Sequence, residues 1–204
     1  MMFSHYNVRM DLLPDVPTAI DAGAAFGEFC LPWASMGGRV VGLEPIPYLA
    51  RELQKNVDLS DYGELVTVVT AALDIREGPG TRLINIWKDN HESTSFYLKN
   101  NMKTPDAVVR VNTLSLADVI RMYLDGRPPD LLKMDIEGEE FEILLTADLT
   151  GIPQIIVEFH RECEADGQYD GCWKRLGELD YVCDGHHGNM KCHQHICRFV
   201  KETK

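Results

Sequence analysis

Short apolar runs alternate with helix-like segments along most of this 204-residue chain. An apolar run that reaches Asp21 and a second one over residues 39–45 predict two strands, and the apolar spacing through residues 48–57 predicts the helix that follows. Residues 65–73 are rich in β-branched side chains, which favour a third strand. Such alternation is typical of an α/β fold in which a mostly parallel, doubly wound sheet carries helices on both faces.

Residues 74–112 interrupt this alternation. The turn-forming sequence EGPG precedes two strand-like segments, TRLINIW and VVRVNTL, and a polar HEST loop at residues 91–94 lies between them. The pattern predicts an inserted antiparallel β-hairpin lobe. We expect this insert and the C-terminal tail to form an acceptor pocket, to which the HEST loop contributes hydroxyl groups. Helical apolar spacing then returns over residues 116–124.

Two further buried strands are predicted in the second half of the chain. In DLLKMDIEGEEFEILL, residues 130–145, we expect a strand that reaches Asp135, then a turn, then a helix from about Glu139. Residues 152–160 predict a short strand that ends at Glu158 and His160. In a doubly wound sheet the ligands lie beyond the carboxyl ends of the strands, which is where these polar residues are expected.

The tail at residues 183–197 is dense in cysteine and histidine. This composition suits zinc, with Cys183, Cys192 and Cys197 beside several histidines, but the spacing contains no CxxC pair. An antiparallel C-terminal hairpin that turns near residues 185–189 accounts for the same side chains by simple alternation. The hairpin is the favoured interpretation, and no metal is assigned to the tail.

The composition agrees with one enzyme-sized domain over residues 1–204. A hydrophobic content of 45% is enough for a substantial core, and the net charge is −12. This acidic balance, without a lysine- or arginine-rich run, argues against general nucleic-acid binding. No apolar run reaches membrane-spanning length and the N-terminus lacks signal-peptide features, so we expect a cytoplasmic protein. Nothing in the sequence indicates an oligomeric state.

The glycine-rich segment TAIDAGAAFGEF, residues 18–29, carries the first chemical signal. Asp21, Gly23 and Gly27 stand at DxGxxxG spacing, which predicts a strand, a sharp turn whose amides a ligand approaches, and a helix starting near Gly27. Dinucleotide-binding turns carry a glycine where this chain has Asp21. A carboxylate repels a pyrophosphate and attracts a cation, so a positively charged nucleoside such as S-adenosylmethionine is the better ligand.

The second strand ends in another acid, Glu44, roughly 20 residues after Asp21. An acidic side chain at that spacing receives ribose hydroxyls, because its two acceptor oxygens match the vicinal hydroxyl groups of the sugar. We expect Glu44 to lie at an open cleft and Ala72 to lie near the adenine side. The residues expected to bind the cofactor are Asp21, Gly23, Ala24, Gly27, Glu44, Pro45 and Ala72.

Six segments, IDAGAAFGEF, GLEPIP, VTVVTAAL, VNTLSLADVI, LLKMDIEGEEFEIL and IIVEFH, follow one another across residues 20–160. Together they resemble the FkbM family of S-adenosylmethionine-dependent methyltransferases, and KMDIEGEE is the most specific of them. The resemblance implies a Rossmann-like class I methyltransferase fold, S-adenosylmethionine as the donor and usually a hydroxyl oxygen as the acceptor. It places Asp135 at the motif that faces the reacting methyl group, and so adds it to the cofactor-binding residues. Ala25 departs from the family, which commonly has asparagine there.

Asp135, Glu158 and His160 are the candidate catalytic residues. A hydroxyl acceptor must lose its proton, and His160 has the most suitable unperturbed pKa for a general base. In a second arrangement the carboxylates hold a divalent cation such as magnesium, which lowers the pKa of the acceptor hydroxyl. The metal-free arrangement is favoured. Lys133, on the same side of its strand as Asp135, is interpreted as the neutralising partner of a nearby acid.

The function expected from this sequence is methylation of a hydroxyl group on a small molecule, a glycan or a lipid-linked acceptor. Two alternatives stay open. A nicotinamide-dependent oxidoreductase uses the same architecture, although Asp21 argues against a dinucleotide. A binding module that retains the cofactor site without catalysis is the other.

Overall fold

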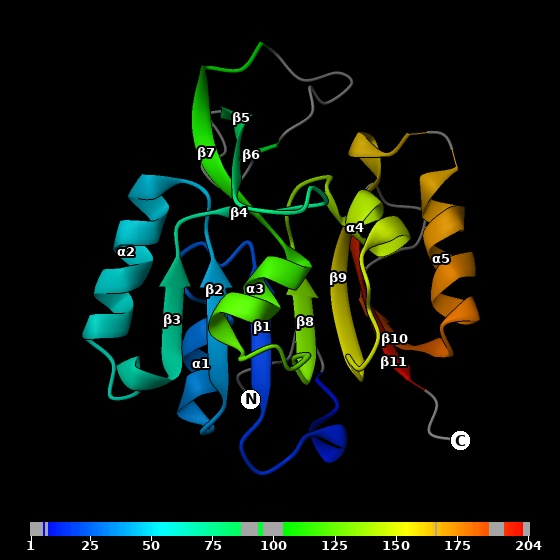
Figure 1. The fold of residues 1–204 in the computed structure, drawn as a ribbon, viewed down its shortest axis with the longest axis horizontal. Coiled ribbons are helices and arrows are strands. Elements are labelled where there is room, and N and C mark those ends of the chain that lie inside the picture. Colours follow the sequence, from blue (N-terminus) through cyan, green and yellow to red (C-terminus); the bar gives the residue numbers. More distant parts are fainter. Residues whose placement is uncertain are drawn as a thin grey trace.

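A seven-stranded, mostly parallel sheet forms the centre of the computed structural model (Figure 1). The structure describes residue 6 and residues 8–86, 94–95, 104–165, 167–187 and 194–201. The strand order is β10-β11-β9-β8-β1-β2-β3, in which β11 pairs antiparallel with β9, and β10 antiparallel with β11. The strands are β1 (Thr18–Ala22), β2 (Arg39–Leu43), β3 (Val66–Val69), β8 (Leu131–Met134), β9 (Gln154–His160), β10 (Tyr181–His187) and β11 (Gln194–Lys201).

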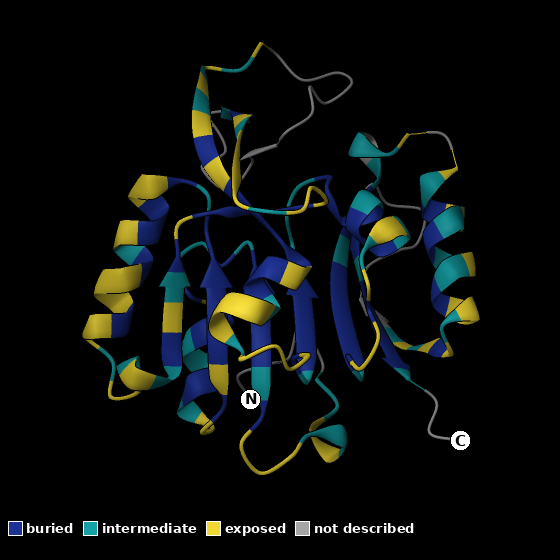
Figure 2. Ribbon diagram, viewed as in Figure 1, coloured by how far each residue is buried: buried dark blue, intermediate teal, exposed yellow. Residues whose placement is uncertain are grey.

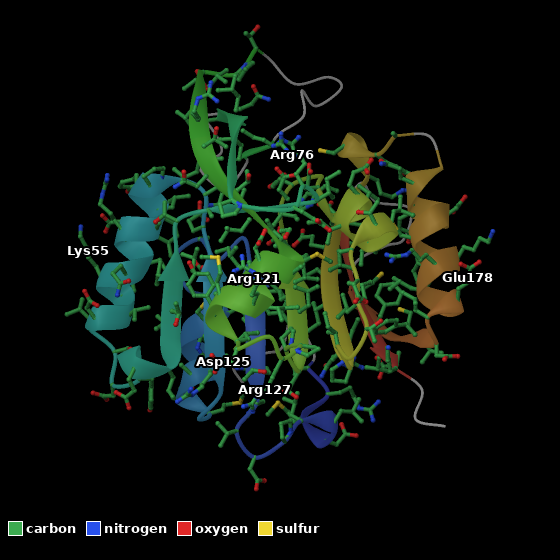
Figure 3. All side chains as sticks on the ribbon, in the orientation of Figure 1. Lys55, Arg76, Arg121, Asp125, Arg127 and Glu178 are labelled. Atoms are coloured by element: carbon green, nitrogen blue, oxygen red, sulfur yellow. The ribbon has the colours of Figure 1, made fainter. Side chains whose placement is uncertain are left out.

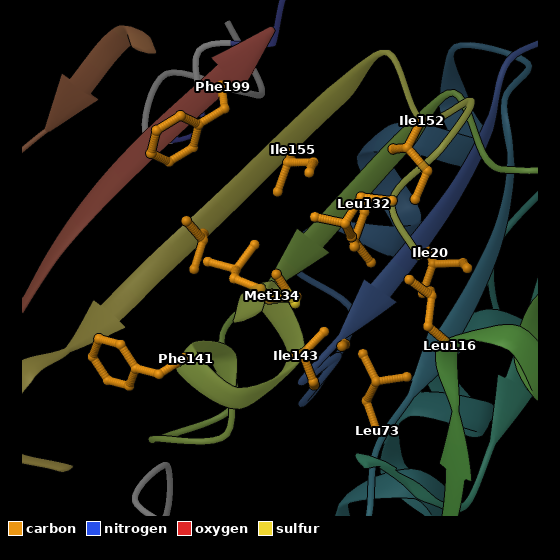
Figure 4. Packing of buried hydrophobic residues seen from close by; sticks show 14 of the residues in the cluster. Ile20, Leu73, Leu116, Leu132, Met134, Phe141, Ile143, Ile152, Ile155 and Phe199 are labelled. Carbon is orange, nitrogen blue, oxygen red and sulfur yellow. The ribbon is translucent and has the colours of Figure 1, made fainter. Parts of the chain in front are cut away.

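Helices cover both faces of this sheet, as predicted for a doubly wound fold (Figures 1 and 2). Ile20 lies in an apolar cluster with residues of α3, α4 and α5, whereas its neighbour Ala19 lies in a second cluster with residues of α1 and α2. Figure 4 shows the first cluster, in which Leu132 and Phe141 also lie. Because successive strand residues point to opposite faces, one strand serves both clusters. The helices are α1 (Cys30–Ser35), α2 (Pro47–Asp58), α3 (Leu116–Tyr123), α4 (Glu140–Thr146) and α5 (Gln168–Glu178), and the short 3-10 turns are η1 (Met10–Leu12), η2 (Gly63–Leu65) and η3 (Arg161–Cys163).

A second, four-stranded sheet forms the inserted lobe, which lies beyond the carboxyl ends of the central strands (Figure 1). Its strands are β4 (Ala72–Asp74), β5 (Gly80–Ile86), β6 (Thr94–Ser95) and β7 (Ala107–Ser115). The predicted antiparallel pairing of the two long strands, β5 and β7, is confirmed. The lobe also contains β4, which pairs parallel with β7. Of the HEST loop, residues 91–93 lie outside the described part of the chain.

The single third strand predicted over residues 65–73 is wrong, because the chain divides it between the two sheets. β3 ends at Val69, and the chain leaves the central sheet before β4 begins in the lobe. The carbonyl oxygen of Val69 accepts hydrogen bonds from the amides of Glu44 and Ala71, each at 3.0 Å, and the second bond closes a tight turn. Residues on both sides of the turn are apolar, so the break leaves no trace in the hydrophobic pattern.

The C-terminal hairpin is present as β10 and β11. The turn predicted near residues 185–189 begins later, because β10 continues to His187 and Gly185 lies at a register shift inside the pairing. Cys183 and Cys197 lie on the two strands, whereas Cys192 and His193 are outside the described residues. Within the described part of the tail, no group of three or more side chains is arranged to hold a metal.

None of the helices in the described part of the chain is long and apolar enough to cross a membrane.

Candidate active site

A cleft of about 410 Å³ lies at the carboxyl ends of the central strands. This volume is within the usual range for small-molecule sites. The cleft is lined by the loop after β1 and by the ends of β2, β8 and β9. Ile84 of the lobe and Tyr6 of the N-terminal segment also line it. Every residue that the sequence assigned to cofactor binding or catalysis lines this cleft except Gly27.

The loop after β1 bends where glycines adopt left-handed backbone angles. Gly23 has φ +80°, and a Cβ atom there would lie 1.8 Å from the carbonyl oxygen of Asp135. The sequence predicted that the helix starts near Gly27. Gly27 has φ +100°, which is not helical, and α1 begins at Cys30 instead. Ala25 has φ +43°, a region that asparagine tolerates better than alanine.

The amides of this loop are engaged within the protein. The amides of Gly23 and Ala24 both donate to the carbonyl oxygen of Leu43, each at 3.0 Å. The amide of Gly27 donates to the carbonyl oxygen of Ala24 at 2.8 Å. The expectation that a ligand finds these amides open is therefore wrong, because the neighbouring β2 strand ends close enough to take two of them.

Asp21 lies beneath the loop as one half of a buried ion pair. It is fully buried, and Lys133 Nζ lies 2.9 Å from its Oδ1 atom. Lys133 also donates to the carbonyl oxygen of Gly23 at 2.9 Å, and Cys30 Sγ donates to Asp21 Oδ2 at 3.2 Å. Burial raises the pKa of Asp21, and it opposes the charged form of Lys133, but the charges of Asp21 and Asp135 raise the pKa of that lysine overall. The predicted neutralising role of Lys133 is confirmed.

Glu44 is more buried than the sequence predicted. Only 4% of the residue is exposed, and its two carboxylate oxygens accept hydrogen bonds from the protein itself. Oε2 accepts from the amide of Ala25 at 3.1 Å, and Oε1 from the amide of Ile46 at 2.8 Å. Burial raises the pKa of Glu44 to about 7. Glu44 therefore braces the turns that follow β1 and β2 while it lines the cleft.

Asp135, Glu158 and His160 meet at the ends of the adjacent strands β8 and β9. One ligand atom from each lies within 4.8 Å of the others. His160 Nε2 lies 3.7 Å from Asp135 Oδ1 and 3.6 Å from Glu137 Oε2. The structure thus brings the three predicted catalytic residues to one point, with Glu137 beside them.

His160 is held in place by Glu140, the first residue of α4. Its amide donates to Glu140 Oε1 at 2.7 Å, and its Nδ1 atom lies 3.1 Å from the same oxygen. Burial alone would lower the pKa of His160, but the hydrogen bond to Glu140 and the charges of Glu140, Glu137 and Asp135 raise it to about 9. The imidazole is therefore protonated at neutral pH and cannot accept a proton there.

Glu158, unlike His160, can accept a proton near neutral pH. Burial and the negative charge of Asp135 raise the pKa of Glu158 to about 7, although the charge of His160 opposes this shift. A carboxylate with such a pKa exchanges protons readily near neutral pH.

The cluster does not fit a divalent cation well. A metal ligand must be deprotonated, but the imidazole of His160 carries a proton that its carboxylate neighbours stabilise. The three-residue group offers two carboxylates and one imidazole, with the carboxylate of Glu137 beside them, whereas a hard cation such as magnesium takes oxygen ligands in preference to nitrogen.

Three raised pKa values predict that the ligand-free protein loses stability as the pH rises. Folding raises the pKa of Glu44 from 4.5, and that of Glu158 from 4.5, to about 7. These contributions are complete below pH 4.5 and are lost by about pH 7. His160, raised from 6.5 to about 9, contributes fully below pH 6.5 and loses its contribution as the pH passes 9. Glu44 alone accounts for roughly 3 kcal/mol.

Urea unfolding between about pH 5 and pH 9 measures this effect. The free energy of unfolding should fall across the whole interval, and Glu44→Gln should flatten the part below pH 7. A free energy that rises over that range would contradict the assigned protonation states.

Sequence reasoning missed Tyr6 and Glu140. Tyr6 packs edge-on against Phe29 with ring centroids 5.6 Å apart, but no motif near Tyr6 indicates a site. Glu140 was part of the recognised segment KMDIEGEE, and its position at the start of a helix was the available signal. Its pairing with His160 joins residues 20 positions apart, which the sequence pattern does not report.

The chain is similar to known methyltransferases. A family model described as the methyltransferase FkbM domain matches residues 21–191. Methyltransferase sdnD of Sordaria araneosa is 29% identical over 161 residues, which are 67% of this chain and 62% of that protein. The chain therefore spans less than two thirds of that relative's length.

Solved structures share the fold. Magnesium protoporphyrin IX methyltransferase (ChlM) from Synechocystis PCC 6803, with bound S-adenosylmethionine, has a TM-score of 0.52 at 15% identity, and the match covers 94% of this chain and 72% of that one. TrmK of M. capricolum, in complex with S-adenosyl-homocysteine, has a TM-score of 0.53 at 9% identity, covering 95% of this chain and 69% of that one. Both matches confirm the Rossmann-like methyltransferase fold predicted from the sequence.

Proposed function

The chain belongs to the FkbM methyltransferase family, and from that premise we propose that it transfers a methyl group from S-adenosylmethionine to a hydroxyl oxygen. The proposed acceptor is a small molecule, a glycan or a lipid-linked hydroxyl compound. The observation that carries the proposal is a cleft in which Glu44 stands at the end of β2, and Glu158 and His160 stand at the end of β9, with β1 and β8 between them.

The β2 end of the cleft suits the adenosine of the donor. Each oxygen of Glu44 accepts one backbone amide and keeps a lone pair, which supports the ribose assignment. Pro45 and Ala72 line the cleft beside it and offer apolar surface to the adenine. Asp21 contributes through the buried pair with Lys133, which holds the loop that borders the cleft.

The β9 end supplies the acid and base chemistry. The bound donor offers an electrophilic methyl group, whose bond to sulfur breaks as the acceptor oxygen forms its bond to carbon, with the electron pair left on sulfur. Glu158 takes the hydroxyl proton, because its raised pKa makes it a stronger base than an ordinary carboxylate. His160 stays protonated, and its charge holds Asp135 and Glu137 near the reacting atoms. Fixing donor and acceptor in line supplies much of the remaining acceleration.

Methyl transfer from labelled S-adenosylmethionine into pooled hydroxyl compounds tests the proposal. Incorporation into a base-stable product is expected, and Glu158→Gln serves as the inactive control. Thermal stabilisation by S-adenosylhomocysteine, without stabilisation by NAD, separates this function from an oxidoreductase. Stabilisation by NAD alone would overturn the proposal, and cofactor binding without transfer to any acceptor would favour a binding module.

Glu44→Ala should weaken S-adenosylhomocysteine binding by roughly ten- to a hundredfold, the cost of two hydrogen bonds to a charged group. This variant should also lose stability, because the amides of Ala25 and Ile46 lose their acceptor. Calorimetry on the folded variant measures the affinity. Glu28→Ala is the matched control, since Glu28 is an exposed acid that lines the same cleft. Equal affinities in the two variants would remove Glu44 from the ribose role.

Exhaustive chelation should leave the rate of methyl transfer unchanged. The reason is that the proposed general base, Glu158, takes the hydroxyl proton without the help of a metal ion. The activity of chelator-treated protein, compared with the same protein after added magnesium, gives the answer. Activity that disappears on chelation and returns with magnesium would assign Asp135 and Glu158 to a metal.

A further inference from the structure

Among the described residues of the inserted lobe, Arg82 forms an ion pair with the turn that precedes α4. Arg82, on β5, has Nη1 2.5 Å from Glu139 Oε1 and 3.4 Å from Asp74 Oδ1. Glu139 is 1% exposed and Asp74 is 1% exposed, so both carboxylates are buried against this guanidinium. Asp74 has a second partner in Arg76, whose Nη2 atom lies 2.7 Å from it. Figure 3 labels Arg76, which lies beside the lobe strands, above the carboxyl ends of the central strands.

Glu139 belongs to the turn that joins β8 to α4. Two residues of this turn adopt left-handed angles, Glu137 at φ +58° and Gly138 at φ +122°. The amide of Gly138 donates to Glu140 Oε2 at 2.7 Å, and Glu140 in turn holds His160. A left-handed glutamate costs about 1 kcal/mol or more and persists only where its surroundings enforce it. The turn is enforced from the lobe by Arg82 and from β9 by His160.

We infer that Arg82 is a positioning residue for methyl transfer, which holds the turn over residues 137–139 so that Glu137 stays beside His160. This inference rests on the proposed function. Arg82 and Ile84 are two residues apart on β5 and therefore share a face of the strand. Ile84 lines the cleft, so the same face of the lobe borders the donor site and fixes the catalytic turn.

The informative change removes both charges of the Arg82–Glu139 ion pair. In Arg82→Met alone, Glu139 would be a buried carboxylate without this counterion, and the variant could lose its fold for that reason. The double variant Arg82→Met/Glu139→Gln removes one positive and one negative charge, and Asp74 keeps its pair with Arg76. Because the net charge is unchanged, a change in the pKa of His160 then reports movement of the carboxylates beside it, Glu137 among them.

The test is an NMR titration of His160 in ligand-free protein, with the signal assigned through His160→Gln. The double variant should lower the pKa of His160 by about one unit, the effect of moving one carboxylate away from it. Arg110→Met is the matched control, since Arg110 lies on β7 of the same lobe and donates to Thr81 Oγ1 at 3.3 Å. Arg82→Lys keeps the charge in case the double variant does not fold, and should give a smaller shift in the same direction.

Kinetics provide the second measurement. The double variant should lower turnover by about ten- to a hundredfold through misalignment while S-adenosylhomocysteine binds with wild-type affinity. If both Arg82 variants keep the wild-type pKa of His160, the inference is overturned and Arg82 only stabilises the lobe. The titration needs neither donor nor acceptor, so it stands apart from the proposed function, which fails if the wild-type protein binds no S-adenosylhomocysteine.

Discussion

Replacing Glu158 with glutamine should lower the rate of methyl transfer by roughly 10²–10⁴, the usual contribution of a general base. Glutamine has nearly the same shape but cannot accept the hydroxyl proton. The affinity for S-adenosylhomocysteine should stay near the wild-type value, because Glu158 lies at the β9 end of the cleft, away from Glu44. Single-turnover kinetics and calorimetry on the same preparation separate the two effects.

The pH profile distinguishes Glu158 from His160 as the base. In the wild-type protein kcat/KM should rise with pH around 7, where Glu158 loses its proton. Glu158→Gln should remove this limb. His160→Gln should move it to higher pH, because the charge of His160 lowers the pKa of Glu158. A limb that survives in Glu158→Gln and disappears in His160→Gln would assign the base to His160, as the sequence alone suggested.

Lys133→Met should destabilise the protein by roughly 3–5 kcal/mol, because it leaves the carboxylate of Asp21 buried without its positively charged partner. Lys133 is 3% exposed and also holds the carbonyl oxygen of Gly23, so the loss extends to the loop beside the cleft. The free energy of unfolding from urea titration is the measurement.

The double variant Lys133→Met/Asp21→Asn provides the control for that prediction. It removes both charges, so much of the lost stability should return. If the double variant is as unstable as the single one, packing of the lysine stem and not the ion pair accounts for the effect.

The sequence predicted the positions of the site residues because they follow apolar runs directly. Glu44 ends one such run and Glu158 lies near the end of another, and the carboxyl ends of parallel strands share one edge of the sheet. The hydrophobic pattern is therefore enough to predict which edge of the sheet carries the site. It could not show that β3 stops at Val69, since both sides of that turn are equally apolar.

The protonation states of the site residues depend on tertiary contacts, which the hydrophobic pattern of the sequence does not contain. His160 has a suitable pKa for a base in isolation, but Glu140 reverses this from a neighbouring helix. The burial of Glu44 depends in the same way on two amides, those of Ala25 and Ile46. Such pairings come from tertiary packing, so the residues were predictable and their roles were not.

A crystal structure of the protein with S-adenosylhomocysteine tests the central claim most directly. The account predicts the ribose hydroxyls at the carboxylate of Glu44 and the sulfur atom on the side of Asp135, with Glu158 facing the position that the transferred methyl group would occupy. A ligand bound in the reverse direction, with its ribose at Glu158, would contradict the account, as would a ligand bound outside this cleft.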